Sequence, residues 1–297
     1  AVARRWFSER ATRTATMMYI LSPIPLLNTA LNGQNQVWLA LLLAVALLLL
    51  AKRDLISGFV FGLTIAAVKL LGLLFAPVLW LFASHRLVWL VGFALMPVWV
   101  YGILLIGGVD VLVPLKVEAH RVTSGNLLYL LSITGLDLDS AAVKWASTAV
   151  LLLALMAVFL IAWARGVQTR PRNVVFLITL VLLTMLLVSK KAYVSYLVLA
   201  FFPICLSLAA RTPSLPLLLF FALFGVAAAV EPSLWFRWMD KDNLSILWQA
   251  ELPEKVTRGR AIAFLLCDLM LLAGYLGYFL RTWRLMWSPP EEADTSG

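Results

Sequence analysis

The stretch AIAFLLCDLMLLAGYLGYFL, residues 261–280, decides the fold class because it is one long apolar run with a single charged residue, Asp268. A helix of about 20 residues extends about 30 Å, the thickness of the hydrocarbon core of a bilayer. The rest of the chain is similar: 63% of its residues are hydrophobic and 13% are charged, a mixture that cannot cover a water-soluble surface. In lipid every backbone polar group needs an internal partner, so the sequence predicts an all-α, polytopic bundle of transmembrane helices.

The stretch 55–84 is too long for one untilted span, and Lys69 and Gly72 lie near its middle. Interpreted as a short helical hairpin, it places the basic pairs 52–53 and 85–86 on the same side of the membrane. Together with the single spans listed next, this hairpin predicts about ten spans. The single spans are expected at 17–31, 37–51, 87–106, 145–164, 174–188, 193–210, 215–230 and 261–280.

The short loops on one side of this topology are all basic, which predicts a cytoplasmic location for that side and for both chain ends. The net charge of +9 is thereby explained by membrane orientation, and no nucleic acid is expected as a partner. We expect an integral, multi-pass protein of a bacterial plasma membrane, with membrane lipids around it. It is interpreted as one domain, 1–297, with a cytoplasmic basic arm 1–16, long external loops 107–144 and 231–260, and a flexible tail 285–297.

Two further features concern the segments outside the spans. The many aromatic and aliphatic residues of 231–260 suggest an amphipathic helix lying on the membrane surface. The chain begins with Ala1 and an arginine-rich arm instead of an initiator methionine and a first apolar span. We therefore expect that the N-terminal part of a longer protein is missing.

Motifs of soluble enzymes are absent: the sequence has no Walker loop, no dinucleotide glycine pattern and no HExxH. Its two histidines are predicted on opposite sides of the membrane. Cys205 and Cys267 lie within apolar runs and are interpreted as packing residues. No cluster of metal-ligand side chains is evident, so neither a metal nor a cofactor is expected.

The topology instead gathers polar residues at the outer face. Lys190 and Lys191 form a short external loop, which the positive-inside rule disfavours; either the topology is wrong there or the pair binds an anion. Lys69, within an apolar stretch, is a functional candidate or a residue that reaches the headgroups from the hairpin turn. Asp268 could neutralise it. The candidate residues for binding a donor phosphate or sugar are Gln34, Asn35, Lys69, Arg121, Lys190, Lys191, Tyr193 and Tyr196.

Three segments carry a family resemblance: YILSPIPLLNTALNGQNQ (19–36), SGFVFGLTIAAVKLLGLLFAPVLWL (57–81) and SKKAYVSYLVLAFFP (189–203). The first resembles the proline and Gly-Gln segment of glycosyltransferase family 87, a mannosyltransferase-like group that uses polyprenyl-phosphate sugars. The second resembles that family's glycine-rich span with its lysine and the proline-containing helix that follows. The third is similar to the entry of a late span in related enzymes, although Lys191 and Ala192 stand where histidine or glutamate is often found.

The resemblance implies a fold of the GT-C type and an enzyme that transfers a sugar, mannose-like or a pentose, at the outer membrane face. The donor would be a polyprenyl-phosphate sugar, and the acceptor a lipid or glycan. Such enzymes generally carry the catalytic carboxylate in a large first external loop, which this sequence lacks. The catalytic base is therefore expected in the missing N-terminal part, with Asp110, Glu118 and Asp268 as alternatives.

Other functions remain open from the sequence. A transporter or lipid flippase should show internal repeats and polar residues near the membrane centre, and neither is evident. A relative of O-antigen polymerases or ligases would need an external residue such as Arg121 or His120. A non-catalytic membrane scaffold is the last alternative.

Overall fold

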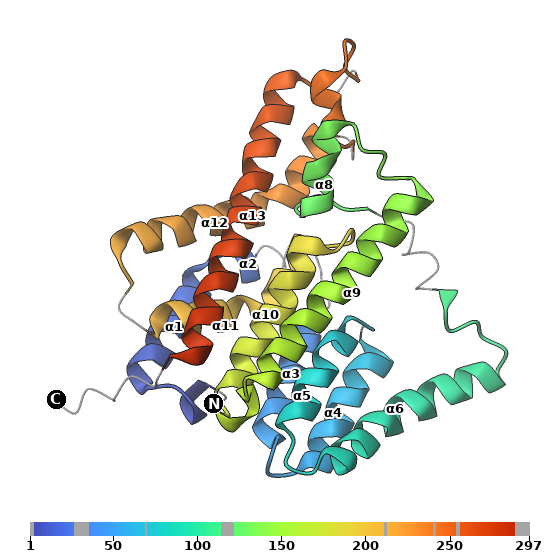
Figure 1. Ribbon diagram of the computed structural model, residues 1–297, viewed down its shortest axis with the longest axis vertical. Helices are drawn as coiled ribbons and strands as arrows, with labels where there is room; N and C mark the ends of the chain where they lie inside the picture. Colours follow the sequence, from blue (N-terminus) through green and yellow to red (C-terminus); the bar gives the residue numbers. More distant parts are fainter. Residues whose placement is uncertain are drawn as a thin grey trace.

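The computed structural model describes residues 3–26, 36–68, 70–113, 122–210, 213–239, 242–253 and 256–288. Within these ranges the chain folds into helices and contains no strand, in agreement with the predicted all-α class. Figure 1 shows the helices gathered into a bundle, with α6 diverging from it.

Four helices in the described part of the chain are long and apolar enough to cross a membrane: α6 (Arg86–Ile106), α9 (Ala141–Ala164), α12 (Leu215–Trp238) and α13 (Arg258–Trp287). Shorter apolar helices add to them: α3 (Gln36–Leu49), α4 (Asp54–Ala67), η3 (Leu70–Phe75) with α5 (Ala76–Phe82), α10 (Asn173–Val188), and η6 (Val194–Leu197) with α11 (Val198–Ala209). The protein is therefore an all-helical membrane protein, whereas the count of ten spans stays a prediction. The remaining elements are η1 (Ala3–Arg5), α1 (Glu9–Leu21), α2 (Pro23–Leu26), α8 (Leu127–Leu131), η4 (Ser132–Thr134), η5 (Val167–Thr169) and η7 (Leu244–Trp248).

Helix α10 forms the centre of the bundle. Every residue from Asn173 to Leu186 is buried, and α9, α11 and α13 pack around it. A helix that is apolar on all sides is expected where protein surrounds it. We use the two ends of α10 to name the two ends of the main bundle.

Arginines gather at the end where α10 begins and bind helix C-termini there, so we call it the basic end. Arg5 donates to the Leu48 carbonyl at 3.1 Å, and Arg281 donates to the Ser207 carbonyl at 3.1 Å. Arg172, just before α10, donates to the Ser288 carbonyl at 2.6 Å. The last carbonyls of a helix lack partners within the helix and favour positive charge. The arginines grouped by the topology thus also hold the ends of α3, α11 and α13.

The two ends of the stretch 55–84 meet at one side chain. The Asp54 carboxylate accepts the backbone N–H of Ala51 at 2.8 Å and that of His85 at 2.7 Å. The start of α4 therefore lies beside the end of α5, as the hairpin interpretation requires. Lys69, which follows α4 in the sequence, lies outside the described residues.

Small residues allow α4 and α6 to pack with their backbones in contact. A Cβ atom on Gly62 would lie 2.3 Å from the Phe93 carbonyl oxygen, and one on Gly58 would lie 2.2 Å from that of Trp89. In the other direction, a Cβ atom on Gly92 of α6 would lie 2.2 Å from the Leu55 carbonyl oxygen of α4. The glycine spacing 58, 62 is the small-xxx-small pattern that brings membrane helices together.

The predicted span 17–31 is wrong in its bounds. Helix α1 already begins at Glu9, inside the predicted basic arm, and it ends at Leu21. Ser22 is extended because it precedes Pro23, and α2 follows after this break. Hydropathy missed the start of α1 because its first two turns are polar.

The predicted surface helix within 231–260 is also wrong. Helix α12 continues through Glu231 to Trp238, and η7 then packs against η4. The result is a second hydrophobic cluster around Tyr129, Ile246 and Phe264, which we call the cap. It lies at the top of Figure 1, above the main bundle.

Candidate functional site

The loop between α10 and α11 carries Lys190 and Lys191, at the end of the bundle opposite the basic end. Helix α10 ends because Ser189 is extended, with φ −71° and ψ 133°. The Lys191 ammonium lies 5.8 Å from the centroid of the Tyr193 ring. The rings of Tyr193 and Tyr196 meet edge to face at 5.4 Å. The structure therefore brings four of the predicted site residues into one short segment, which we call the cationic loop (residues 189–196).

Thr123 fixes the cationic loop to the segment before α8. Its backbone N–H donates to the Lys190 carbonyl at 2.9 Å, and its hydroxyl oxygen accepts the Ala192 N–H at 2.9 Å. Thr123 is buried, so water competes little for these bonds. The backbone that carries both lysines is consequently held in place.

Gln36 brings the end of the polar run 32–36 to the same loop. Its side-chain amide donates to the Ser195 hydroxyl at 3.4 Å, and Gln36 is buried at the start of α3. Gln34 and Asn35 precede it but lie outside the described residues. The predicted convergence of this run with the cationic loop is therefore shown for Gln36.

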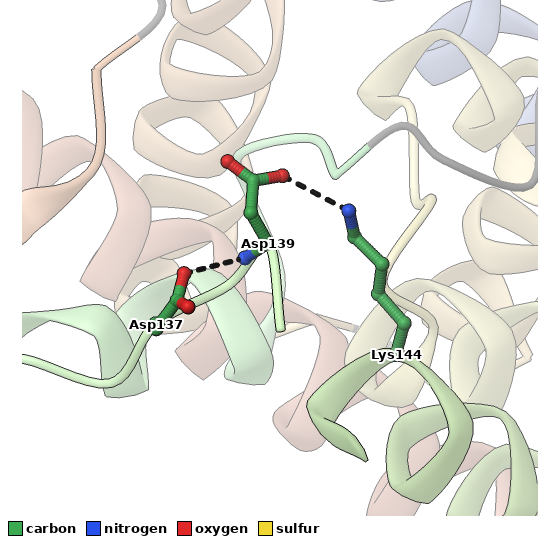
Figure 2. Close-up of polar contacts among 3 residues, drawn as sticks. All are labelled: Asp137, Asp139 and Lys144. Carbon is green, nitrogen blue, oxygen red and sulfur yellow. Dashed lines mark hydrogen bonds and ion pairs between the residues drawn. The ribbon is translucent and has the colours of Figure 1, made fainter. Parts of the chain in front are cut away.

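Lys144, at the start of α9, adds a third positive charge near the loop. Its ammonium contacts the Asp139 carboxylate at 2.9 Å, and the Asp139 N–H donates to Asp137 at 2.9 Å, as Figure 2 shows. Burial, and then the charge of Lys144, hold the pKa of Lys190 below its ordinary value. The loop thus concentrates positive charge, which suits an anionic ligand.

Two carboxyl groups lie beneath the loop, in α12 and α13. Glu231 is buried and accepts a hydrogen bond from the Ser124 hydroxyl. Asp268 is fully buried, and its charge interacts with that of Glu231. Asn126 closes the turn above them by donating to the Thr123 carbonyl at 2.6 Å and capping α8 through Tyr129 N–H.

The alternative catalytic carboxylates are not brought together. Asp110 is exposed just after α6 and accepts the Leu112 N–H at 2.9 Å, whereas Asp268 is buried in α13. Glu118, Arg121 and Lys69 lie outside the described residues. In the part of the chain that is described, no group of three or more His, Cys, Asp or Glu side chains is gathered in one place.

Sequence reasoning missed Glu231 and Lys144 as members of this site. Hydropathy predicts that the apolar span ends at residue 230, which places Glu231 in the external loop that follows. Its continuation as helix past Pro232 and its contact with Ser124 are tertiary features. The sequence signal that could have identified Glu231 as a site residue is its charge, directly at the end of an apolar run.

The family model of glycosyltransferase family 87 matches residues 1–189. This range contains every described helix from η1 to α10. It stops at Ser189, the first residue of the cationic loop. No curated protein and no solved structure matches the chain. The matched range covers more than half of the sequence and agrees with the family that its motifs resemble. The chain thus belongs to glycosyltransferase family 87, and its apolar helices make it a membrane glycosyltransferase.

Proposed function

We propose that this protein transfers a sugar, mannose-like or a pentose, from a polyprenyl-phosphate donor to a lipid or glycan acceptor at the outer membrane face. The cationic loop carries the proposal. When the sugar leaves, negative charge develops on the donor phosphate, and fixed cations stabilise that charge. Lys190 and Lys191 supply such cations on a backbone held by Thr123.

The position of the loop fits a lipid-linked substrate. It lies where α10 ends and α11 begins, at the end of apolar helices. The phosphate of a membrane-anchored donor lies at the same level, where the hydrocarbon ends. The tyrosine rings beside the lysines belong to the residue types that favour this interface.

An acceptor hydroxyl also needs a carboxylate within reach to take its proton. At this end Asp137 and Asp139 are exposed, whereas Glu231 and Asp268 are buried. The exposed pair can meet an acceptor without rearrangement. We therefore include Asp137 and Asp139 among the candidate bases, beside Asp110, Glu118 and Asp268.

Sugar transfer from radiolabelled polyprenyl-phosphate donors, with the protein in membranes, tests this function. The double variant Lys190→Met/Lys191→Met should lose donor binding and transfer while keeping its thermal unfolding midpoint. The matched control is Lys52→Met, which removes an exposed lysine beside α4 and should behave as the parent protein. Unchanged donor affinity in the double variant would refute the role of the loop. Absence of transfer by the parent with every donor tried would refute the proposed function.

A further inference from the structure

Glu231 and Asp268 lie in a polar layer between the two hydrophobic clusters. In α12, Ala228 packs in the main cluster and Trp235 packs against the cap, with Glu231 between them. In α13, Phe264 belongs to the cap and Leu271 to the main cluster, with Asp268 between them. Glu231 is 2% exposed and Asp268 is 0% exposed. Two carboxyl groups therefore occupy the junction through which the cap is joined to the bundle.

Several oxygen atoms in this layer lack a side-chain donor. Among the described residues no side chain donates to the Asp268 carboxyl group, which the Gly125 backbone N–H approaches, and the Tyr275 hydroxyl has no hydrogen-bond partner. Tyr275 is 0% exposed and lies two turns after Asp268 on the same face of α13. The charges of Glu231 and Asp268 both act on it. The three groups thus lie close enough to interact electrostatically, and the Tyr275 hydroxyl is unsatisfied.

Within the described part of the chain, the two acidic groups also lack a positive partner. No lysine or arginine of the described residues forms an ion pair with Glu231 or Asp268. Two uncompensated negative charges in an apolar interior are costly and repel each other. Either protons or a bound cation must neutralise them.

The oxygen atoms favour a cation over protons. One proton on the pair would leave one negative charge buried. Two protons would remove the charge but would leave the Tyr275 hydroxyl and at least one Asp268 oxygen without a hydrogen-bond partner, at a cost for each. A divalent cation balances both charges and takes the unsatisfied oxygens as ligands. Carboxylate and hydroxyl oxygens are the ligands that Mg²⁺, Ca²⁺ and Mn²⁺ prefer.

The segment from Thr123 to Asn126 completes the layer. Gly125 has φ +73°, and a Cβ atom there would lie 3.1 Å from Val194 and 3.8 Å from the Glu231 carboxylate. Glycine therefore lets this backbone turn close to the acidic groups. Ser124 contributes its hydroxyl at the same place.

We propose that Glu231 and Asp268 hold one divalent cation between α12 and α13, with Tyr275 and Ser124 as further oxygen ligands. The cation ties the cap to the membrane bundle. The proposal is independent of the donor and acceptor, because the site is defined by buried side chains and not by the cationic loop.

The test uses the full chain, purified in detergent and stripped with EDTA. Mn²⁺ is titrated and followed by electron paramagnetic resonance, and the thermal unfolding midpoint is measured with Mn²⁺, Mg²⁺ or Ca²⁺. We expect saturable binding of one Mn²⁺ per chain, displacement by excess Mg²⁺ or Ca²⁺, and a raised midpoint. Asp268→Asn and Glu231→Gln, which keep side-chain shape, should each weaken Mn²⁺ binding by at least about tenfold. Tyr275→Phe, which removes only the hydroxyl, should weaken it less.

Asp139→Asn is the matched control, since it removes an exposed carboxylate at the same end, and it should bind Mn²⁺ as the parent does. Two results would overturn the proposal. The first is no saturable Mn²⁺ binding to the parent chain, which decides the matter even if a variant fails to fold. The second is parent-like binding by both folded carboxyl variants, which would place the ion elsewhere.

Discussion

The Ser124 hydroxyl donates a hydrogen bond to the Glu231 carboxylate, which joins the segment before α8 to a membrane helix across 107 positions of sequence. Both residues are buried. Removing the donor therefore leaves a polar group that water cannot readily reach. Such a loss costs about 1–3 kcal/mol.

We expect Ser124→Ala to lower the free energy of unfolding by about 1–3 kcal/mol, seen as a lower thermal midpoint in detergent. Thr134→Ala is the control, because the Thr134 hydroxyl is exposed and donates only to the neighbouring turn. That variant should change stability by less than about 0.5 kcal/mol. Equal midpoints for the two variants would contradict the importance of the buried bond.

The packing of α4 on α6 predicts a second stability effect. Gly62→Ala places a methyl group 2.3 Å from the Phe93 carbonyl oxygen, and backbone cannot move aside as a side chain does. We expect a loss of about 1–3 kcal/mol or more, measured by thermal unfolding. The control is Gly102→Ala in α6, where a Cβ atom meets nothing within 4 Å. It should stabilise the helix slightly, because alanine has the higher helix propensity.

These two contacts differ in how far sequence could predict them. Hydropathy alone places α6, α9 and α10 almost correctly, because lipid requires apolar helices; α13 extends three residues before and seven residues beyond the predicted span 261–280. The glycine spacing 58, 62 is visible in the sequence, but its partner helix is not. The bond from Ser124 to Glu231 could not be predicted, since it depends on how a long connection folds back over the bundle.

The site residues that the sequence predicts differ from those that it misses in whether a local pattern indicates them. Lys190 and Lys191 were identified because they violate a charge rule that acts locally along the chain. Glu231 and Lys144 violate no such rule. Their position beside the cationic loop follows from the packing of α9, α10, α12 and α13. Local patterns therefore indicate the loop, and only the tertiary structure adds the residues around it.

Lys190 predicts a pH effect with a definite sign. Burial and the charge of Lys144 hold its pKa below the ordinary lysine value, so its positive charge is lost earlier as pH rises. Lys144→Met removes the repulsion and should raise the pKa of Lys190. Asp139→Asn leaves Lys144 without its ion pair and should lower the pKa of Lys190 further.

Competitive acetylation of the purified protein from neutral to alkaline pH, read by mass spectrometry, reports the pKa of Lys190 directly. Lys52, exposed beside α4, serves as the internal reference in each sample. Shifts in opposite directions for the two variants support the electrostatic link. Identical Lys190 titrations in the parent protein and both variants would show that Lys144 does not act on it.

The orientation of the bundle predicts which loops an impermeant reagent can reach. The basic end carries Arg5, Arg172 and Arg281, and positive residues in short loops favour the cytoplasm. Helix α9 runs from the cap side to this end and is long and apolar enough to cross a membrane. We therefore expect the loops before and after it on opposite sides of the membrane. Thr134 and Thr169 are exposed on these two loops.

We expect the Thr134→Cys variant to react with a membrane-impermeant maleimide on intact cells, and the Thr169→Cys variant only after lysis. Cys205 is buried and Cys267 half-buried, so the parent protein gives the background for both. Reversed labelling would mean that the cationic loop faces the cytoplasm, and the donor phosphate would then have to be presented from that side. Labelling of both variants on intact cells would contradict the passage of α9 through the membrane.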